Sequence, residues 1–153
     1  MSDHRTKFDN LISAIEQLKN GILLFSNEND LLRDGLIQRF EFTFELAWKT
    51  LKVCFEDEGL IGINSPKAVL REAFSAGLID NDNLWLEMLN DRNSTSHLYS
   101  KSLAISICNK IIEKYSDEFE KLASQIKRRY FEWIVNSYKE GKTSSAGTQN
   151  NFL

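Results

Sequence analysis

Apolar residues recur along this chain at intervals of three and four positions, the spacing of residues that share one face of an α-helix. The first such row runs from Phe8 to Phe25 and ends in a short polar stretch. A longer row begins near Asp30 and reaches Phe55, and Gly59 then supplies a helix stop. Additional apolar side chains make this second row wider than one neighbouring helix can cover. We therefore expect the second helix to lie at the centre of the fold.

Start and stop signals predict two shorter helices in the middle of the chain. Ser65 and Pro66 favour a helix start, because serine caps the first turn and proline fits the first helical position. This third helix should end at Gly77. A fourth helix should begin near Asp80 or Asp82, which we interpret as N-capping residues rather than as the carboxylates of a nucleotide site.

The last part of the chain continues the helical pattern. Apolar rows predict a fifth helix through residues 103–112, and Ser116 is interpreted as the N-cap of a sixth helix that reaches Tyr130. No stretch makes a convincing strand, because the short alternation near residue 105 has no partner strand elsewhere. The predicted fold class is therefore all-α, an antiparallel bundle of five to six helices.

Length and composition fit one globular domain. The 153 residues are 42% hydrophobic and 27% charged, so we expect a helical bundle in residues 1–138 and a polar, disordered tail in 139–153. The net charge of −3 argues against a general nucleic-acid coat but leaves room for a local basic patch. No signal peptide or membrane-spanning stretch is visible, and Cys54 and Cys108 fit buried free thiols. We therefore expect a cytoplasmic protein without membrane association.

The segment 92–99, with the sequence RNSTSHLY, carries the most chemical information. His97 is one of two histidines, and the other, His4, falls in an N-terminal stretch that we expect to fray. An imidazole exchanges a proton near neutral pH, and the Arg92 guanidinium can bind a phosphate through two hydrogen bonds. Together they form a minimal set for cleaving a phosphodiester without a metal. The alternative is a polar loop whose histidine caps a helix.

The spacing within this segment predicts a break in the helix. In an unbroken α-helix each residue turns by about 100°, so Arg92 and His97 would point about 140° apart, whereas Asn93 and His97 would share a face. Asn, Ser and Thr fill positions 93–96, and these residue types favour caps and turns over helix interiors. A helix that ends here lets Arg92 turn toward His97, or else a second copy of the chain supplies the opposing charge. Either way, the polar cluster belongs at a helix junction.

Other kinds of site are disfavoured by the sequence. The nearest approach to a phosphate-binding loop, residues 59–62, lacks the lysine and the serine or threonine that bind phosphate. One interior histidine and two separated cysteines argue against zinc, so we predict no metal and no cofactor. Glu41 and Glu45 lie four residues apart on the second helix. A solvated face or a partner contact explains them better than a carboxylate metal site.

The arrangement of Arg92, four intervening residues, His97 and then Tyr99 resembles the signature of the HEPN superfamily, in which a polar residue commonly follows the arginine. Asn93 fills that position. A second similarity is the block 35–49, GLIQRFEFTFELAWK, which resembles the second helix of nucleotidyltransferase substrate-binding proteins. These are the HEPN partners of small nucleotidyltransferases and are related to the HepT toxins.

The resemblance extends over roughly residues 5–135 and implies a homodimer of helical bundles, with both Arg-His motifs facing one cleft. Active members are metal-independent endoribonucleases. In that role Arg92 would hold the scissile phosphate of RNA, His97 would move protons, and Asn93 would orient the imidazole or donate a further hydrogen bond. In the toxin branch a cognate minimal nucleotidyltransferase, an MntA-like antitoxin, neutralises the enzyme by adding AMP to the motif tyrosine, here Tyr99.

Three functions stay open on this basis, with the ribonuclease as the leading hypothesis. In the first interpretation the chain is a HepT-like toxin that cleaves RNA. In the second it is a non-catalytic subunit that presents a substrate to its nucleotidyltransferase. In the third interpretation it is a structural subunit in which Arg92 and His97 serve only the dimer interface. A nucleotidyltransferase gene next to this one would support the first two functions, and its absence would weaken both.

Overall fold

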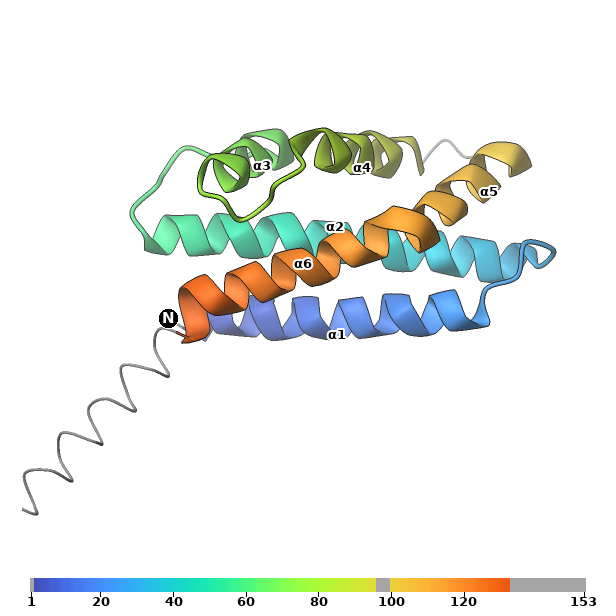
Figure 1. Cartoon of the computed structure of the whole chain (residues 1–153), viewed down its shortest axis with the longest axis horizontal. Coiled ribbons are helices and arrows are strands. Elements are labelled where there is room, and N and C mark those ends of the chain that lie inside the picture. The colour runs from blue at the N-terminus through green and yellow to red at the C-terminus, as the bar shows by residue number, and fades with distance from the viewer. Residues whose placement is uncertain (1, 96–99, 133–153) are drawn as a thin grey trace, which may run out of the picture.

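The computed structural model describes residues 2–95 and 100–132, and within these ranges every regular element is a helix (Figure 1). The elements, in chain order, are α1 (Ser2–Leu24), α2 (Asp30–Asp57), α3 (Pro66–Ser75), α4 (Asp82–Ser94), α5 (Lys101–Lys110), η2 (Ile111–Tyr115), α6 (Ser116–Ile126) and η3 (Lys127–Glu132). The last four are consecutive in the chain and form one long rod. The predicted all-helical bundle is confirmed.

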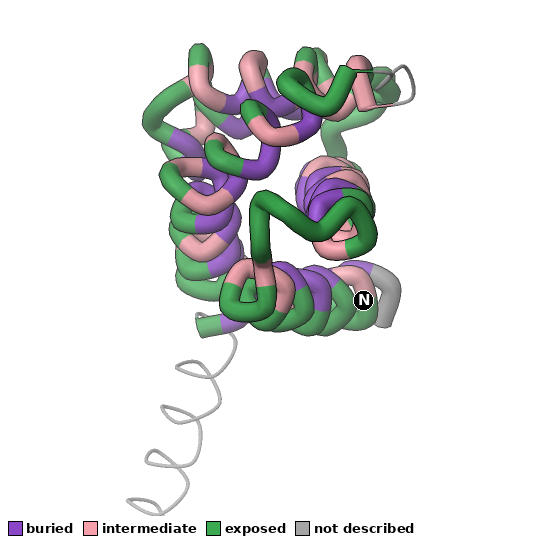
Figure 2. Tube along the Cα trace, turned by 90° about the vertical axis from the view of Figure 1, so that its right-hand side faces the viewer, coloured by how far each residue is buried: buried purple, intermediate pink, exposed green. Residues whose placement is uncertain are grey.

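The rods lie antiparallel around α2 (Figure 1). α1 runs back along one side of α2, while α3 and α4 follow one another along the opposite side. The long C-terminal rod returns across α1 and α2. α2 contacts α1, α3, α4, α5 and α6, which confirms that the second helix is central. Figure 2 shows that the buried residues lie on the inward faces of the helices.

The predicted starts and stops of the central helices are confirmed, with one change of capping residue. The Ser65 hydroxyl accepts a hydrogen bond from the backbone N–H of Ala68 at 3.2 Å, which caps α3. Gly59 and Gly77 follow α2 and α3 with φ of 93° and 76°, a left-handed conformation that favours glycine. The cap of α4 is Asn81, rather than either neighbouring aspartate, and it accepts from the N–H of Leu84 at 3.1 Å.

α6 begins at Ser116, but the prediction that Ser116 is an N-cap is wrong, because its side chain makes no capping hydrogen bond among the described residues and the preceding residue is already helical. The φ of −58° and ψ of −43° of Ser116 are helical, and its side chain is buried inside the long C-terminal rod. The π-helical turn η2 precedes it and adds a residue to the turn, which changes the register of the apolar face. The sequence therefore contains two apolar rows that look like two helices, although the backbone between them never leaves the helix.

Aromatic side chains from α2 and the C-terminal rod form the centre of the core. Phe40 stacks on Tyr115 with ring centroids 5.4 Å apart, and the Phe44 and Trp85 rings lie 6.3 Å apart. Trp85 also meets Phe119 edge-on at 5.6 Å. All five side chains are fully buried, so the core holds α4 against both α2 and the C-terminal rod.

Two sequence expectations about single residues have different outcomes. Cys54 and Cys108 are free and buried, as predicted. The expectation that His4 lies in a frayed end is wrong, because its side chain is buried and its Nδ1 pairs with the Asp57 carboxylate. Its ring also lies 5.5 Å from that of Phe131, so the start of α1 is fixed to the ends of two other elements.

None of the described helices is both long enough and apolar enough to cross a membrane. The region that we expected to be a polar tail, 139–153, lies outside the described residues, as do His97 and Tyr99.

Candidate functional site

The described part of the polar segment, residues 92–95, lies at the end of α4, where we predicted that a helix ends. α4 ends at Ser94, Thr95 is its C-cap, and Ser100 caps the start of α5 by accepting from the N–H of Leu103 at 3.3 Å. The Thr95 hydroxyl donates to the Arg92 carbonyl at 2.7 Å, and the Ser94 hydroxyl donates to a carbonyl one turn earlier. Such side-chain bonds to backbone carbonyls compete with helix propagation.

Arg92 lies in the last turn of α4 and turns toward α2. Its Nη2 lies 3.2 Å from Oε1 of Glu45, and 29% of the arginine side chain and 30% of the glutamate side chain are exposed. The Arg92 Nε is buried without a hydrogen-bond acceptor. The guanidinium therefore keeps donors that its partner does not use. Asn93 follows on the exposed side of the same turn.

Glu45 belongs to this site, which the sequence did not indicate. Its Oε1 faces Arg92, while its Oε2 accepts from the Trp48 indole N–H at 3.3 Å and lies 3.5 Å from the Lys49 ammonium. The Glu45 side chain is only partly exposed and has contacts within its own chain, which were not predicted from the sequence. The Glu45–Lys49 spacing on one helix was visible in the sequence, but nothing in the sequence connects residues 45 and 92.

The cluster of Arg92, Glu45 and Lys49 has one more positive than negative charge, because two cations share one carboxylate. In a chain with a net charge of −3 this is a local reversal of sign. A partly buried guanidinium with unused donors and a nearby ammonium is suited to bind a phosphate or a carboxylate.

The turn of α4 that carries Arg92 is fixed from the opposite side by the preceding residue. The Asp91 carboxylate accepts from the Tyr115 hydroxyl and lies 3.1 Å from the Lys110 ammonium. Burial and Asp91 raise the pKa of Tyr115 well above its ordinary value, so its hydroxyl stays a donor. One turn earlier, Glu87 lies 3.0 Å from the Lys114 ammonium, and the hydrogen bond from Lys114 is the main cause of the lowered pKa of Glu87.

Sequence reasoning located two of its four proposed site residues within the described structure. Arg92 and Asn93 lie on consecutive positions at the end of α4. His97 and Tyr99 lie outside the described residues. In the described ranges, no group of three or more His, Cys, Asp or Glu side chains has an arrangement that could hold a metal ion.

The fold and site together define a helical bundle with a partly buried arginine at the junction of two helices. The chain belongs to the nucleotidyltransferase substrate binding protein like family, whose sequence model matches residues 6–128. A Haemophilus influenzae protein named "Probable ribonuclease HepT" is 34% identical over 104 residues, which are 65% of this chain and 70% of that protein.

The solved structures that resemble this one include proteins from two organisms. A protein from Thermus thermophilus is 36% identical, with a TM-score of 0.69, over 76% of this chain and 98% of its own. A protein from Haemophilus influenzae, described as revealing the fold of a substrate binding domain of a nucleotidyltransferase, is 28% identical, with a TM-score of 0.60, over 82% of this chain and 98% of its own. The family predicted from the sequence motifs is confirmed.

Proposed function

We propose that this chain is a HepT-like ribonuclease, the toxin of a pair whose antitoxin is a minimal nucleotidyltransferase. The observation that supports it is the Arg92 guanidinium, which lies at a helix junction with an unused buried donor and a net positive surrounding. The 34% identity to a probable ribonuclease HepT supports the same activity. RNA is the proposed substrate, because its phosphodiester is the group that an arginine clamp recognises.

In the proposed reaction Arg92 binds the scissile phosphate and offsets the charge that develops on its oxygens. Glu45 is a positioning residue, because it holds the guanidinium at the end of α4 without contacting the reacting atoms. Asp91 acts from the other side, through the bonds that fix the same turn to the C-terminal rod.

The proton transfers are assigned to His97, with Asn93 orienting its imidazole or donating a further hydrogen bond. The 2′-hydroxyl of RNA attacks the adjacent phosphorus and gives its proton to His97. The bond from phosphorus to the 5′-oxygen breaks, and that oxygen takes the proton from the protonated His97, which returns the imidazole to its starting state. The products are a 2′,3′-cyclic phosphate and a 5′-hydroxyl. Every proton and bond is supplied by the RNA and the side chains, so the proposal needs no metal.

Homodimerisation is part of the proposal, because it would bring two copies of the Arg92 segment to one cleft. Exposed leucines support it, since they gather where α1 ends and where α2 and α5 begin, at the same end of the bundle as the α4–α5 junction (Figure 1). These leucines are Leu23, Leu24, Leu31 and Leu103. A shared surface at this end would bury them and place the two junctions next to each other.

Neutralisation is assigned to Tyr99. Its phenol oxygen would attack the α-phosphorus of ATP bound with magnesium by the partner nucleotidyltransferase, releasing pyrophosphate and the phenolic proton. The AMP group would add about one negative charge near Arg92 and compete with the RNA phosphate. Intact-protein mass spectrometry after incubation with the partner and ATP tests this, since an unchanged mass or an adduct on another tyrosine contradicts it.

The alternative function is a non-catalytic subunit that presents a substrate to its nucleotidyltransferase. The description of the 28% identical Haemophilus influenzae structure favours it. Expression of wild type beside His97→Ala and Arg92→Ala separates the two functions. The ribonuclease predicts growth arrest and RNA cleavage for wild type alone. An Arg71→Ala control, which alters an exposed arginine on α3, should remain toxic. Growth and intact RNA with wild type would favour the alternative.

A further inference from the structure

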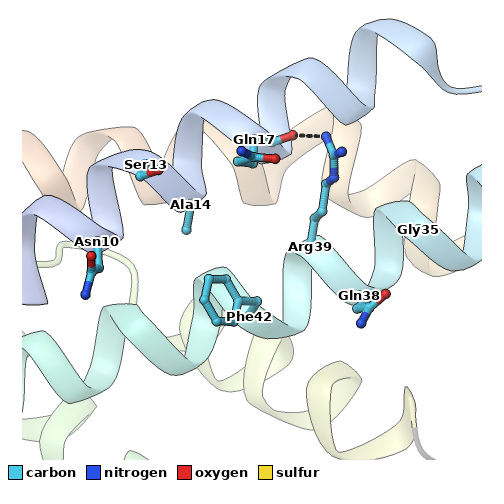
Figure 3. A pocket seen from close by; sticks show the side chains of 8 residues that line it. All are labelled: Asn10, Ser13, Ala14, Gln17, Gly35, Gln38, Arg39 and Phe42. Atoms are coloured by element: carbon cyan, nitrogen blue, oxygen red, sulfur yellow. Dashed lines mark hydrogen bonds between the residues drawn. The ribbon is translucent and has the colours of Figure 1, made fainter.

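A hollow of about 610 Å³ lies between α1 and α2, outside the site described above (Figure 3). Its size falls within the range of about 300–1,000 Å³ that is usual for small-molecule sites. The lining residues are Asn10, Ser13, Ala14, Gln17, Gly35, Gln38, Arg39 and Phe42. Small side chains make the space, and apart from its chain neighbours and its own helix backbone no heavy atom lies within 4 Å of the position that a Cβ on Gly35 would take.

The lining combines apolar surface with amide, hydroxyl and guanidinium groups and has no acidic residue, although the chain contains 22 aspartates and glutamates. Amides and a hydroxyl provide both donors and acceptors along the walls. Arg39 reaches across one end of the hollow from α2 and donates to the backbone carbonyl of Gln17 on α1 (Figure 3). Gly21 leaves room for it, because a Cβ there would lie 3.3 Å from Cδ and Nη1 of Arg39.

Phe42 stands between the two helices at the other side of the hollow, with 60% of the residue exposed (Figure 3). An exposed aromatic ring beside amides and a guanidinium is the combination that binds an unpaired nucleobase, through stacking and edge hydrogen bonds. The absence of carboxylates from the lining favours a polyanion.

The hollow lies on the α1 side of α2, whereas Arg92 lies on α4 at the opposite side, and residues of α2 link the two sites. Phe42 and Glu45 are three residues apart, a spacing that places two side chains on neighbouring parts of one helix surface, about 5–6 Å apart at Cβ. Glu45 in turn contacts Arg92. An RNA strand with one base against Phe42 would therefore run across this face of α2 to reach the guanidinium that we assign to the scissile phosphate.

We propose that the α1–α2 hollow is a nucleobase subsite, which holds one unpaired base of RNA on Phe42 with its edge toward the amides of Asn10 and Gln17. Arg39 faces the backbone phosphate on the far side of that base. The inference rests on the proposed function and extends it, because it names single-stranded RNA as the substrate class and makes the base beside the cleavage position a determinant of specificity.

The test measures binding rather than cleavage. Labelled RNA oligomers with 2′-O-methyl groups lack the attacking hydroxyl and cannot be cut, so fluorescence anisotropy gives their Kd. A series of oligomers, each lacking one base, identifies the base that contributes to affinity. Phe42→Leu should weaken binding of the complete oligomer about tenfold, as expected for the loss of one stacked base. It should leave unchanged the Kd of the oligomer that lacks that base.

Two further variants support the measurement. Phe74→Leu is the matched control, because Phe74 on α3 is also exposed, at 45%, and lies outside the hollow. Its Kd should equal that of wild type. Gly35→Leu fills the hollow without removing any polar side chain and should weaken binding as Phe42→Leu does. Circular dichroism and light scattering accompany each variant to show that its fold and mass are unchanged.

Equal affinity of wild type and Phe42→Leu for every oligomer would overturn the subsite. An equal loss of RNA affinity in Phe74→Leu would also overturn it. A fall from dimer to monomer mass in Phe42→Leu would overturn it too, because it would identify the Phe42 face as a contact between copies of the chain. The proposed ribonuclease can fail separately. Wild type that cleaves no RNA but binds with the predicted dependence on one base would reject the enzyme and keep the subsite.

Discussion

Replacing Glu45 by glutamine separates the two effects that its carboxylate has on Arg92. The carboxylate lies 3.2 Å from the guanidinium, where it competes with any phosphate that approaches. Two unit charges at about 4 Å interact by about 1 kcal/mol in water and by more in a less polar medium. Because the pair is partly exposed, we take the lower figure, which corresponds to about fivefold in affinity. Glu45→Gln should therefore bind RNA about fivefold more tightly at low salt.

The same substitution should slow the reaction of bound RNA, because Arg92 loses the group that holds it in place. We expect the single-turnover rate to fall by about tenfold, since a small misplacement of a binding group is costly in the transition state. The melting temperature should change little, because partly exposed ion pairs contribute only about 0.2–1 kcal/mol. Binding and rate should thus move in opposite directions.

Glu41→Gln is the matched control for this experiment. It removes the same charge from the same helix, one turn away, and Glu41 has no ion pair among the described residues. Anisotropy with an uncleavable oligomer gives the Kd of each variant, and a quenched-flow or manual time course gives the rate. Weaker binding by Glu45→Gln, or the same changes in both variants, would refute the reasoning.

Three further outcomes follow from single features of the structure. Gly35→Ala should raise the melting temperature by about 2–4 °C, because alanine favours the helix by about 1 kcal/mol and its methyl group would meet no side chain or other element within 4 Å. A lower melting temperature measured by calorimetry would contradict this. Burial raises the pKa of Cys54 to about 12 and that of Cys108 to about 11. A chromogenic disulfide reagent at pH 8 should therefore label both thiols only when urea unfolds the protein. Rapid labelling of the folded protein would contradict this prediction. Lys114 lowers the pKa of Glu87 below 4.5, so this carboxylate stabilises the fold above pH 4.5 and loses that effect as the pH falls through its lowered pKa. Denaturation of Glu87→Gln should therefore show a shallower loss of stability on acidification, and an unchanged pH profile would count against it.

The sequence predicted the fold because its helix signals are local. The serine at position 65 and the glycines at 59 and 77 act on backbone groups within one turn, so they can be recognised without knowing the fold. Ser116 misled for the same reason. Serine is a good N-cap by residue type, but packing in the core keeps the backbone helical at this position. The neighbouring residues in the sequence do not predict that tertiary effect.

The candidate site was predictable only in part. Arg92 and its position at a junction follow from residue types and from the run of cap-forming residues after it. The partner of Arg92 does not, because Glu45 is brought to it by the packing of α4 on α2. The same is true of the α1–α2 hollow, whose walls come from residues about 25 positions apart in the chain. His4 was misjudged because its contact with Asp57 also depends on packing between distant elements.

The central claim is that Arg92 serves a ribonuclease, and cleavage of RNA by the purified protein in EDTA tests it most directly. The account predicts that wild type leaves 2′,3′-cyclic phosphate and 5′-hydroxyl ends. Arg92→Ala should cleave at least about 100-fold more slowly with the same helical content, because it lacks the group that offsets the developing charge. The Arg71→Ala control should match wild type. Equal cleavage by wild type and Arg92→Ala, or loss of wild-type cleavage on adding EDTA, would contradict the account.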